Sequence, residues 1–354
     1  MKALVLAGGS GIRLRPFTHS MPKQLFPIAN RPVLFYGLEA IGAAGVHDVG
    51  VVVGDHAEAI RQAVGDGASF GLKITYIRQD LPLGLAHCVA IARDFLADED
   101  FVMYLGDNVI GDGVEPIVSA FGRTRPAARV MLGKVGDPRR FGVAEVGPDG
   151  RVLRLAEKPA VPRSDLAMIG AYVFSPAVHE AIAAIEPSER GEREITDALS
   201  WLVAHDHVVE AHVSSGYWQD TGTFAGVLDC NRAMLDAITP AVLGSVDDAS
   251  ELIGPVVVEE NATVSRSRVI GPAVIGSGAT VSESRIGPYT SIGAKCTVDR
   301  SVVENSIILG GSSLHGIPGM RDSLIGRDAD VRRAETPGSC SLILGDHSSV
   351  APAV

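Results

Sequence analysis

The feature that most constrains the fold is a repeat of aliphatic residues in the last third of the chain. From Leu252 onward helical periodicity is absent, and an aliphatic residue returns at a step of six. A six-residue step with one aliphatic residue on each flat side is typical of a triangular parallel β-helix, in which stacked coils bury one another. The predicted inward residues fall in four sets that begin 17, 17 and 16 residues apart: Leu252, Val258 and Val264; Val269, Ile275 and Val281; Ile286, Ile292 and Val298; Val302, Ile308 and Leu314.

The repeat also sets the limits of a domain. Residues 316–319, Gly-Ile-Pro-Gly, predict a loop that leaves the coil, and the small and acidic stretch 239–251 predicts a boundary. We therefore predict a β-helix domain over 250–354 and a separate domain over 1–238. The aliphatic residues that resume the repeat after the loop are Leu324, Val331, Leu344 and Val350.

Composition limits the classes of function. The chain has 354 residues, 46% of them apolar, which suits a globular protein of about two domains. Its net charge of −11 argues against general binding to nucleic acid or to an anionic membrane. No run approaches the roughly 18 apolar residues of a membrane helix, and no signal peptide is visible. The scattered cysteines fit reduced thiols in the cytoplasm: Cys88, Cys230, Cys296 and Cys340.

The chain begins with a predicted buried strand, Lys2–Ala7, that ends in a glycine-rich loop with three cations behind it. Glycines let the backbone approach a ligand with bare N–H groups, which suits an anionic phosphate chain. A P-loop is excluded because Gly-Lys-Ser/Thr does not close the turn. A dinucleotide fingerprint is excluded because Leu14-Arg15-Pro16 stands where its third glycine would open a helix. The alternative is a solvated basic turn. The loop glycines are Gly8, Gly9 and Gly11, around Ser10, and the cations are Arg13, Arg15 and Lys23.

Alternating elements follow the loop. Residues 33–45 and 57–64 predict helices, while 48–53 and 73–78 predict buried strands. Strands that alternate with helices at this spacing indicate βαβ units, hence an α/β domain with a mainly parallel sheet. Ligands in such sheets bind beyond the carboxyl ends of the strands, where the glycine-rich loop falls.

Two aspartates follow predicted strands. Asp107 ends the apolar strand 101–105, and Asp220 lies between the strand 208–213 and a helix that reaches Leu235. A hard cation is commonly held by one or two carboxylates together with substrate phosphates. The alternative for each residue is a cap on the turn or helix that follows it.

Other polar residues are ambiguous from their residue type alone. Gln79 can read a pyrimidine edge, but a loop glutamine is usually solvated. A predicted hairpin, 141–146 with 151–156, ends at Glu157-Lys158, which could equally be an exposed ion pair. Arg190 opens a charged run that could be a solvated helix start.

Several strings together resemble a known family. GGSGIRLRP (8–16), PKQLFPIANRPVLFY (22–36), GDN (106–108) and YWQDTG (217–222) resemble the sugar-1-phosphate nucleotidylyltransferases, and among these the long form of the glucose-1-phosphate thymidylyltransferases. The resemblance covers nearly the whole chain, and it implies a Rossmann-like catalytic domain followed by a left-handed β-helix. Three positions depart from the family pattern, which usually has Thr at Ile12, Lys at Gln219 and often Lys at Thr223.

The resemblance implies a role for each matching residue. Asp107 and Asp220 would hold Mg²⁺, Arg13 would stabilise pyrophosphate, and Lys23 would support the phosphates. Lys158 and Arg190 would hold the phosphate of the sugar 1-phosphate. The implied nucleotide contacts are Gly8, Gly9, Ser10, Gly11, Gln24, Gln79 and Gly84. The implied sugar contacts are Gly142, Glu157 and Tyr172.

The implied reaction joins dTTP and glucose 1-phosphate into dTDP-glucose and pyrophosphate. The alternatives are the same chemistry with another triphosphate or another sugar or cyclitol phosphate, a hexapeptide acyltransferase, and a non-catalytic regulatory subunit. An acyltransferase would need a histidine base, and His315 and His347 are the histidines of the repeat region. We expect the flat faces of the repeat to mediate self-association into a homo-oligomer.

Overall fold

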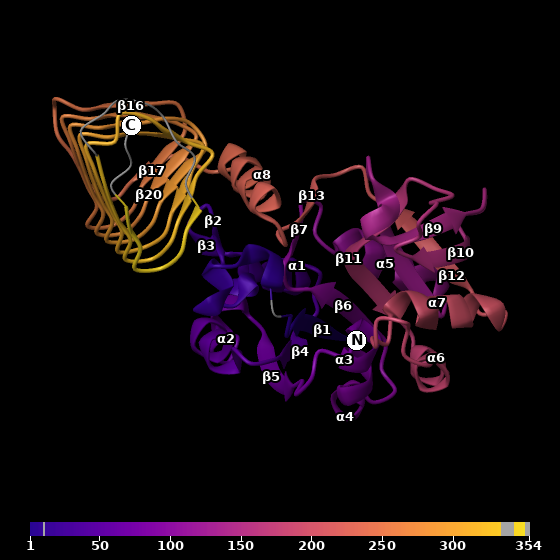
Figure 1. Cartoon of the computed structure of the whole chain (residues 1–354). Coiled ribbons are helices and arrows are strands. Elements are labelled where there is room, and N and C mark those ends of the chain that lie inside the picture. Colours follow the sequence, from indigo (N-terminus) through magenta and orange to yellow (C-terminus); the bar gives the residue numbers. More distant parts are fainter. Residues whose placement is uncertain (10, 334–342, 351–354) are drawn as a thin grey trace. The chain divides into compact units, whose positions relative to one another are not determined.

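The computed structural model describes residues 1–9, 11–333 and 343–350. The chain divides into two compact units. One contains residues 1–10 and 33–220, and the other contains 11–32 and 221–354 (Figure 1). The segment behind the glycine-rich loop therefore belongs to the unit of the C-terminal repeat and not to the sheet that precedes it.

The first unit is built on a mixed, mainly parallel sheet, as predicted. Among the described residues it has nine strands, with β10-β9-β11-β6-β1-β4-β5 in order and β8 pairing with β11 and β12. Strands β1, β4, β5 and β6 run parallel, and β11 runs antiparallel to β6 and β8. The strands are β1 (Lys2–Ala7), β4 (Asp48–Val53), β5 (Lys73–Arg78), β6 (Phe101–Leu105), β8 (Ala128–Lys134), β9 (Gly142–Val146), β10 (Val152–Glu157), β11 (Leu166–Phe174) and β12 (Val209–Val213).

Helices connect and cover these strands. The helical segment after Gly84 is interrupted at Ala92, whose backbone N–H donates to the carbonyls of Cys88 and Val89. The helices are α1 (Val33–Ala43), α2 (Ala57–Val64), α3 (Leu85–Ile91), α4 (Arg93–Leu96), α5 (Glu115–Thr124), α6 (Val178–Ala184) and α7 (Ile195–Ala204), with 3-10 turns at Ala68–Phe70 and Pro138–Arg140. A separate two-stranded ribbon pairs β7 (Asn108–Ile110) with β13 (Trp218–Asp220).

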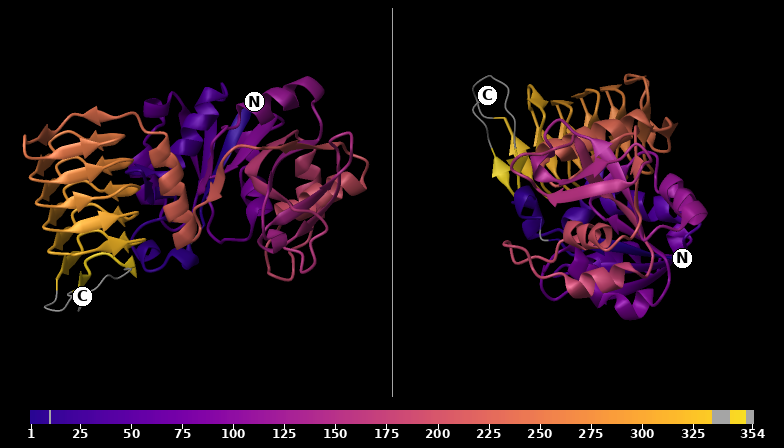
Figure 2. Two further views of the ribbon diagram at one scale, coloured as in Figure 1. Left: turned by 90° about the horizontal axis from the view of Figure 1, so that it is seen from above. Right: turned by 90° about the vertical axis from the view of Figure 1, so that its right-hand side faces the viewer.

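The second unit contains the predicted left-handed parallel β-helix. Two seven-stranded sheets and one five-stranded sheet form its sides in the described residues. Figure 1 looks along the triangular stack of coils, and Figure 2 shows the coils one beneath another. Their inward aliphatic side chains, such as Val264, Ile275 and Val298, are 0% exposed.

The sides of the coil are as follows. The first is β14 (Ala241–Val242), β17 (Val256–Val258), β20 (Ala273–Ile275), β23 (Thr290–Ile292), β26 (Ile307–Ile308), β29 (Leu324–Ile325) and β31 (Ile343–Leu344). The second is β15 (Ser245–Val246), β18 (Thr263–Ser265), β21 (Thr280–Ser282), β24 (Thr297–Asp299), β27 (Ser313–His315), β30 (Asp330–Arg332) and β32 (Ser349–Val350). The third is β16 (Glu251–Ile253), β19 (Arg268–Ile270), β22 (Arg285–Ile286), β25 (Val302–Glu304) and β28 (Met320–Arg321).

Two details of the predicted repeat are wrong. Val302 points outward, and Val303 fills the inward position opposite Ile286 because the following turn is one residue shorter. The β-helix also begins before residue 250, because Ala241–Val242 already pairs with β17.

Helix α8 (Phe224–Asp236) and the segment 11–32 complete the second unit. Val274, on the outer face of a β-helix sheet, packs in a core cluster with Leu235 of α8 and Ala29 of the segment. Phe17 contacts Phe26 and Phe224 edge-on. The elements of the segment are 3-10 turns at Ile12–Leu14, Phe17–His19 and Lys23–Leu25, and the ribbon β2 (Pro27–Ile28) with β3 (Arg31–Pro32).

Candidate active site

The carboxyl ends of β1, β4 and β5 meet beside a glutamine. A Cβ on Gly8, which follows β1, would lie 2.9 Å from Oε1 of Gln79, which follows β5. It would also lie 3.4 Å from the backbone nitrogen of Gly54, which follows β4. Gly8 therefore leaves Gln79 room at the sheet edge where ligands of α/β proteins bind.

A histidine orients the amide of Gln79. The amide nitrogen Nε2 of Gln79 lies 3.1 Å from Nδ1 of His87 on α3. Burial, with a contribution from Arg193, lowers the pKa of His87, so the ring is neutral near pH 7 and Nδ1 accepts the amide proton. The opposite atom of the amide, Oε1, then faces Gly8. Gln79 thus turns its acceptor oxygen toward the glycine-rich loop at the sheet edge.

The backbone around Gly84 requires a glycine at this position. Its φ is +101°, and a Cβ there would lie 2.4 Å from the carbonyl oxygen of Arg193. The backbone N–H of Arg193 donates to Leu83, and that of Ala86 donates to Arg193. This glycine is therefore required by the close approach of another backbone segment, and its contact with a base stays a prediction.

The ribbon of β7 and β13 brings the two predicted metal ligands together. Asp220 pairs with Asn108, the neighbour of Asp107. Nδ2 of Asn108 donates to Asp107 over 3.3 Å, and its Oδ1 accepts from Nε1 of Trp218 over 2.7 Å. Asp107 is 8% exposed. The side-chain amide of Asn108 thus links both strands and orients the carboxylate of Asp107.

The structure overturns the capping alternative for Asp220 only. Asp107 lies in the turn between β6 and β7, so its alternative as a cap of a turn stays a prediction. The N-cap of α8 is Thr223, whose Oγ1 accepts from Gly226, and not Asp220. Carboxylates are ligands that Mg²⁺ takes when phosphates and water complete its shell, and the pairing of Asp220 with Asn108 places the segments of both aspartates side by side, so their chemistry fits that ion. The described residues contain no group of three or more His, Cys, Asp or Glu placed to hold a metal.

A second cluster forms around Glu157 at the end of β10. Its Oε1 lies 3.2 Å from Nζ of Lys158 and 3.5 Å from a guanidinium nitrogen of Arg190. Its Oε2 accepts from Oγ1 of Thr196 over 2.6 Å. A Cβ on Gly142, opposite Glu157, would lie 2.2 Å from Met168 and 3.2 Å from Oε2 of Glu157. The structure therefore brings together four of the predicted sugar-phosphate residues.

Acidic neighbours hold the cations of this cluster. Arg190 also pairs with Glu194, and this hydrogen bond raises the pKa of Arg190. Burial, with Glu194 and Glu157 adding to it, raises the pKa of Asp197. Lys158 has a φ of +41°, a conformation that costs a non-glycine residue energy and that clusters at functional sites. The acidic neighbours therefore hold both cations in defined positions beside Glu157.

Tyr172 lies in the core and does not line an open pocket. Its side chain is 3% exposed and stacks on Phe174 with ring centroids 5.9 Å apart. Burial, with the nearby Glu157, raises its pKa. The ring is therefore closed off from solvent in this structure, and its contact with a sugar stays a prediction.

The predicted phosphate loop continues in the second unit. Gly11 has a φ of +63°, and a Cβ there would lie 2.8 Å from Thr18 and 3.2 Å from Cβ of Lys23. Gln24 is 1% exposed, and its Oε1 has no hydrogen-bond partner among the described residues. A buried orphan acceptor calls for an explanation, and a ligand donor would satisfy it. Arg13 and Gly9 are exposed, and Ser10 lies outside the described residues.

The sequence interpretation missed the residues that hold the predicted ones in place. Thr196 is one of them, and its bond to Glu157 had no signal in the sequence. The others are His87, Asn108, Trp218 and Glu194. A partner distant in sequence leaves no local pattern, so only the fold could reveal them.

This fold, with polar clusters beside the carboxyl ends of parallel strands, is typical of α/β enzymes that bind phosphate-containing ligands. The family model for nucleotidyl transferases matches residues 2–237, and the chain belongs to this family. In the described residues no helix is long and apolar enough to cross a membrane.

Named relatives are similar over nearly the full length. Glucose-1-phosphate thymidylyltransferase of Streptomyces griseus is 57% identical over 98% of both chains, and that of Streptomyces antibioticus is 54% identical over 99% of both. A low-salt glycan biosynthesis nucleotidyltransferase of Haloferax volcanii is 43% identical over 99% of both. A solved structure of a putative glucose-1-phosphate thymidylyltransferase from Bacillus anthracis matches with a TM-score of 0.63 and 33% identity, covering 68% of this chain and 97% of that one.

Proposed function

We propose that this chain transfers dTMP from dTTP to glucose 1-phosphate and releases pyrophosphate. The observation that carries the proposal is the near full-length identity of 57% and 54% with two thymidylyltransferases. A match confined to the nucleotide-binding strands would not identify the sugar phosphate that accepts the nucleotide. Here the match spans the cluster around Glu157 as well.

In the proposed reaction an oxygen of the sugar phosphate attacks the α-phosphorus in line, and pyrophosphate leaves. Such transfers depend on positioning and charge neutralisation more than on a covalent nucleophile. Lys158 and Arg190 would orient the attacking phosphate, because Glu157 and Glu194 hold them in fixed positions. Arg13 and Lys23 are proposed to neutralise the leaving pyrophosphate.

Base selection is assigned to Gln79. The N3–H of thymine or uracil is a donor, and the amide oxygen beside Gly8 is an acceptor that the bond to His87 aims in one direction. Cytosine has no proton at N3, so its N3 acceptor would face the acceptor oxygen of Gln79 and no hydrogen bond would form. The amide therefore supports a thymine or uracil nucleotide.

Asp107 and Asp220 are proposed to hold Mg²⁺, which when bound would neutralise phosphate charge. Asn108 supports this role because it links β7 and β13 through Asp107 and Trp218. The remaining proposed nucleotide contacts are Gly8, Gly9, Ser10, Gly11, Gln24 and Gly84, and the remaining sugar contact is Gly142.

The test is pyrophosphate release with glucose 1-phosphate and each of dTTP, UTP, ATP, CTP and GTP, with Mg²⁺ or with EDTA. We expect release that is fastest with dTTP and abolished by EDTA. If folded protein releases no pyrophosphate with any of the five triphosphates, glucose 1-phosphate is refuted as the acceptor. A preference for ATP or CTP, whose bases have no proton on the matching ring nitrogen, would refute the assignment of Gln79.

Two further expectations remain proposals. Self-association through the β-helix is tested by light scattering, and a monomer at micromolar concentration would contradict it. A cytoplasmic location is supported by three described cysteines that are buried and form no disulfide, Cys88, Cys230 and Cys296.

A further inference from the structure

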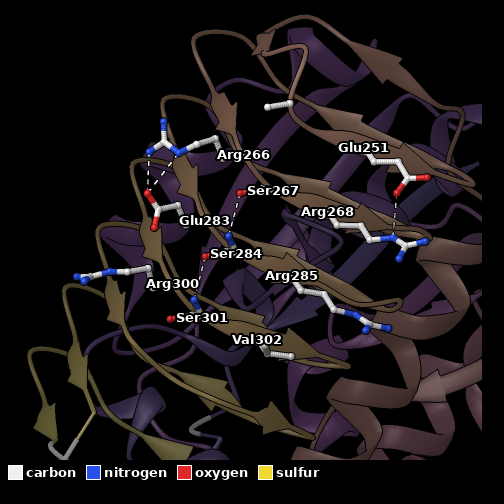
Figure 3. Close-up of a pocket in the computed structure, with 11 residues that line it drawn as sticks. Glu251, Arg266, Ser267, Arg268, Glu283, Ser284, Arg285, Arg300, Ser301 and Val302 are labelled. Carbon is white, nitrogen blue, oxygen red and sulfur yellow. Dashed lines mark hydrogen bonds and ion pairs between the residues drawn. The ribbon is translucent and has the colours of Figure 1, made fainter.

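A groove lined by arginines runs along one edge of the β-helix. It crosses successive coils between the strands β16, β19, β22 and β25 and the turns that precede them (Figure 3). Its volume is about 470 Å³, which lies within the range of small-molecule sites. The charged residues of its walls are Glu251, Arg266, Arg268, Glu283, Arg285 and Arg300.

The floor of the groove is a ladder of buried serines. The backbone N–H of Ser284 donates to Oγ of Ser267, and that of Ser301 donates to Oγ of Ser284, each over 3.0 Å. The hydroxyls of Ser267 and Ser284 in turn donate to backbone carbonyls. This bonding fixes the spacing of the coils, so donors for a ligand must come from the arginine walls.

The walls carry four arginines and two glutamates, and Arg300 pairs with Asp299 over 2.8 Å. Arg266 pairs with Glu283 over 2.9 Å, and Arg268 pairs with Glu251 over 3.1 Å (Figure 3). Arg285 is exposed and has no ion-pair partner in the part of the chain that the structure describes.

Arg285 lies directly opposite another arginine. It pairs in register with Arg268 on the next coil, and neighbouring strands are about 4.8 Å apart. Like charges directly opposite each other on a sheet destabilise it. A bound anion would remove this cost, and two guanidinium forks one coil apart would contact two anionic groups at once.

We propose that this groove binds a compound carrying two linked phosphate groups. A diphosphate places its charges within reach of Arg268 and Arg285 together, whereas a single small anion would use one of them. A long nucleic acid is disfavoured by the net charge of −11 and by the two glutamates in the walls. None of these residues takes part in the proposed transfer reaction, so the site is separate from it.

The test is site-resolved arginine labelling of the full-length protein with phenylglyoxal, read by peptide mass spectrometry. Inorganic pyrophosphate should protect Arg285 and Arg268, by about tenfold when its concentration is tenfold above Kd. Arg321 is the internal control, because it lies on β28 of the same sheet and pairs with Glu304 but is outside the groove. Site resolution separates this binding from any binding of pyrophosphate elsewhere.

A second arm uses ADP in place of pyrophosphate. Protection by both compounds would mean that the diphosphate group suffices, and protection by pyrophosphate alone would identify the free anion as the ligand. Equal protection by sulfate at matched ionic strength, or equal protection of Arg321, would overturn the proposal because either shows screening only. In Arg285→Gln the protection of Arg268 should be lost, whereas Arg321→Gln should retain it, and undiminished protection in the first variant would also refute it.

Discussion

Asn231 on α8 joins three segments of the second unit through one buried amide. Its Oδ1 accepts from the backbone N–H of Ala29 and from Oγ of Ser291, each over 2.8 Å. Its Nδ2 donates to the carbonyl of Tyr289 over 3.2 Å. Both Asn231 and Ser291 are 0% exposed. This amide therefore ties the segment that carries Lys23 and Gln24 to the β-helix.

Asn231→Leu keeps the volume of the side chain and removes all three hydrogen bonds. Each of the three buried groups left without a partner costs about 1–3 kcal/mol, so the segment should be destabilised by about 3–9 kcal/mol. Because about 1.4 kcal/mol corresponds to a factor of ten, the amide of Ala29 should exchange its proton about 10²- to 10⁶-fold faster through local opening.

Hydrogen exchange of the peptide that contains Ala29, read by mass spectrometry, measures this opening. The matched control is Asp229→Asn, because Asp229 is exposed on the same helix. The control should leave the exchange rate unchanged. An increase of less than about threefold in Asn231→Leu would refute the reasoning, because it would mean that the three bonds contribute under 1 kcal/mol together.

Three further predictions concern the candidate active site. Asn108→Ala removes the amide that bonds Asp107, so the affinity for Mn²⁺, measured by electron paramagnetic resonance, should fall about 10- to 100-fold; an unchanged affinity would contradict the metal assignment. Thr196→Val removes a bond to a carboxylate worth about 1.5–3 kcal/mol, so the KM for the sugar phosphate should rise about 10- to 100-fold while the KM for the triphosphate stays constant. Because the pKa of His87 is lowered in the folded protein, its neutral ring orients Gln79 fully at pH values above 6.5, the ordinary pKa of histidine. This orientation is lost as the pH falls through the lowered pKa of the folded state. The KM for the triphosphate should therefore rise in acid, and His87→Gln should remove that pH dependence.

Elements with a strong local period were predicted well. The strands at 48–53 and 73–78 and the helix at 57–64 have the bounds that the sequence predicts. The β9–β10 hairpin is confirmed. These elements are recognisable because each one alternates or repeats apolar residues over its own length.

Errors occurred where a single residue changes the register. Val302 is as aliphatic as Val303, and a constant step of six favours Val302. The register is decided by pairing of β25 with β22, which places Val303 opposite Ile286. A turn shortened by one residue is invisible in composition, and a one-residue slip moves a side chain to the other face of a sheet.

The sequence by itself determined the two folds, the order of the strands along the chain and the carboxylates and cations that end them. The reason is that period and loop chemistry are local properties, written in neighbouring residues. The tertiary structure alone decided that residues 11–32 pack with the β-helix unit, that Tyr172 is buried, and that His87, Asn108 and Thr196 orient the predicted residues. These outcomes depend on contacts between distant segments, whose partners are chosen by packing and by the need of buried polar groups for hydrogen bonds.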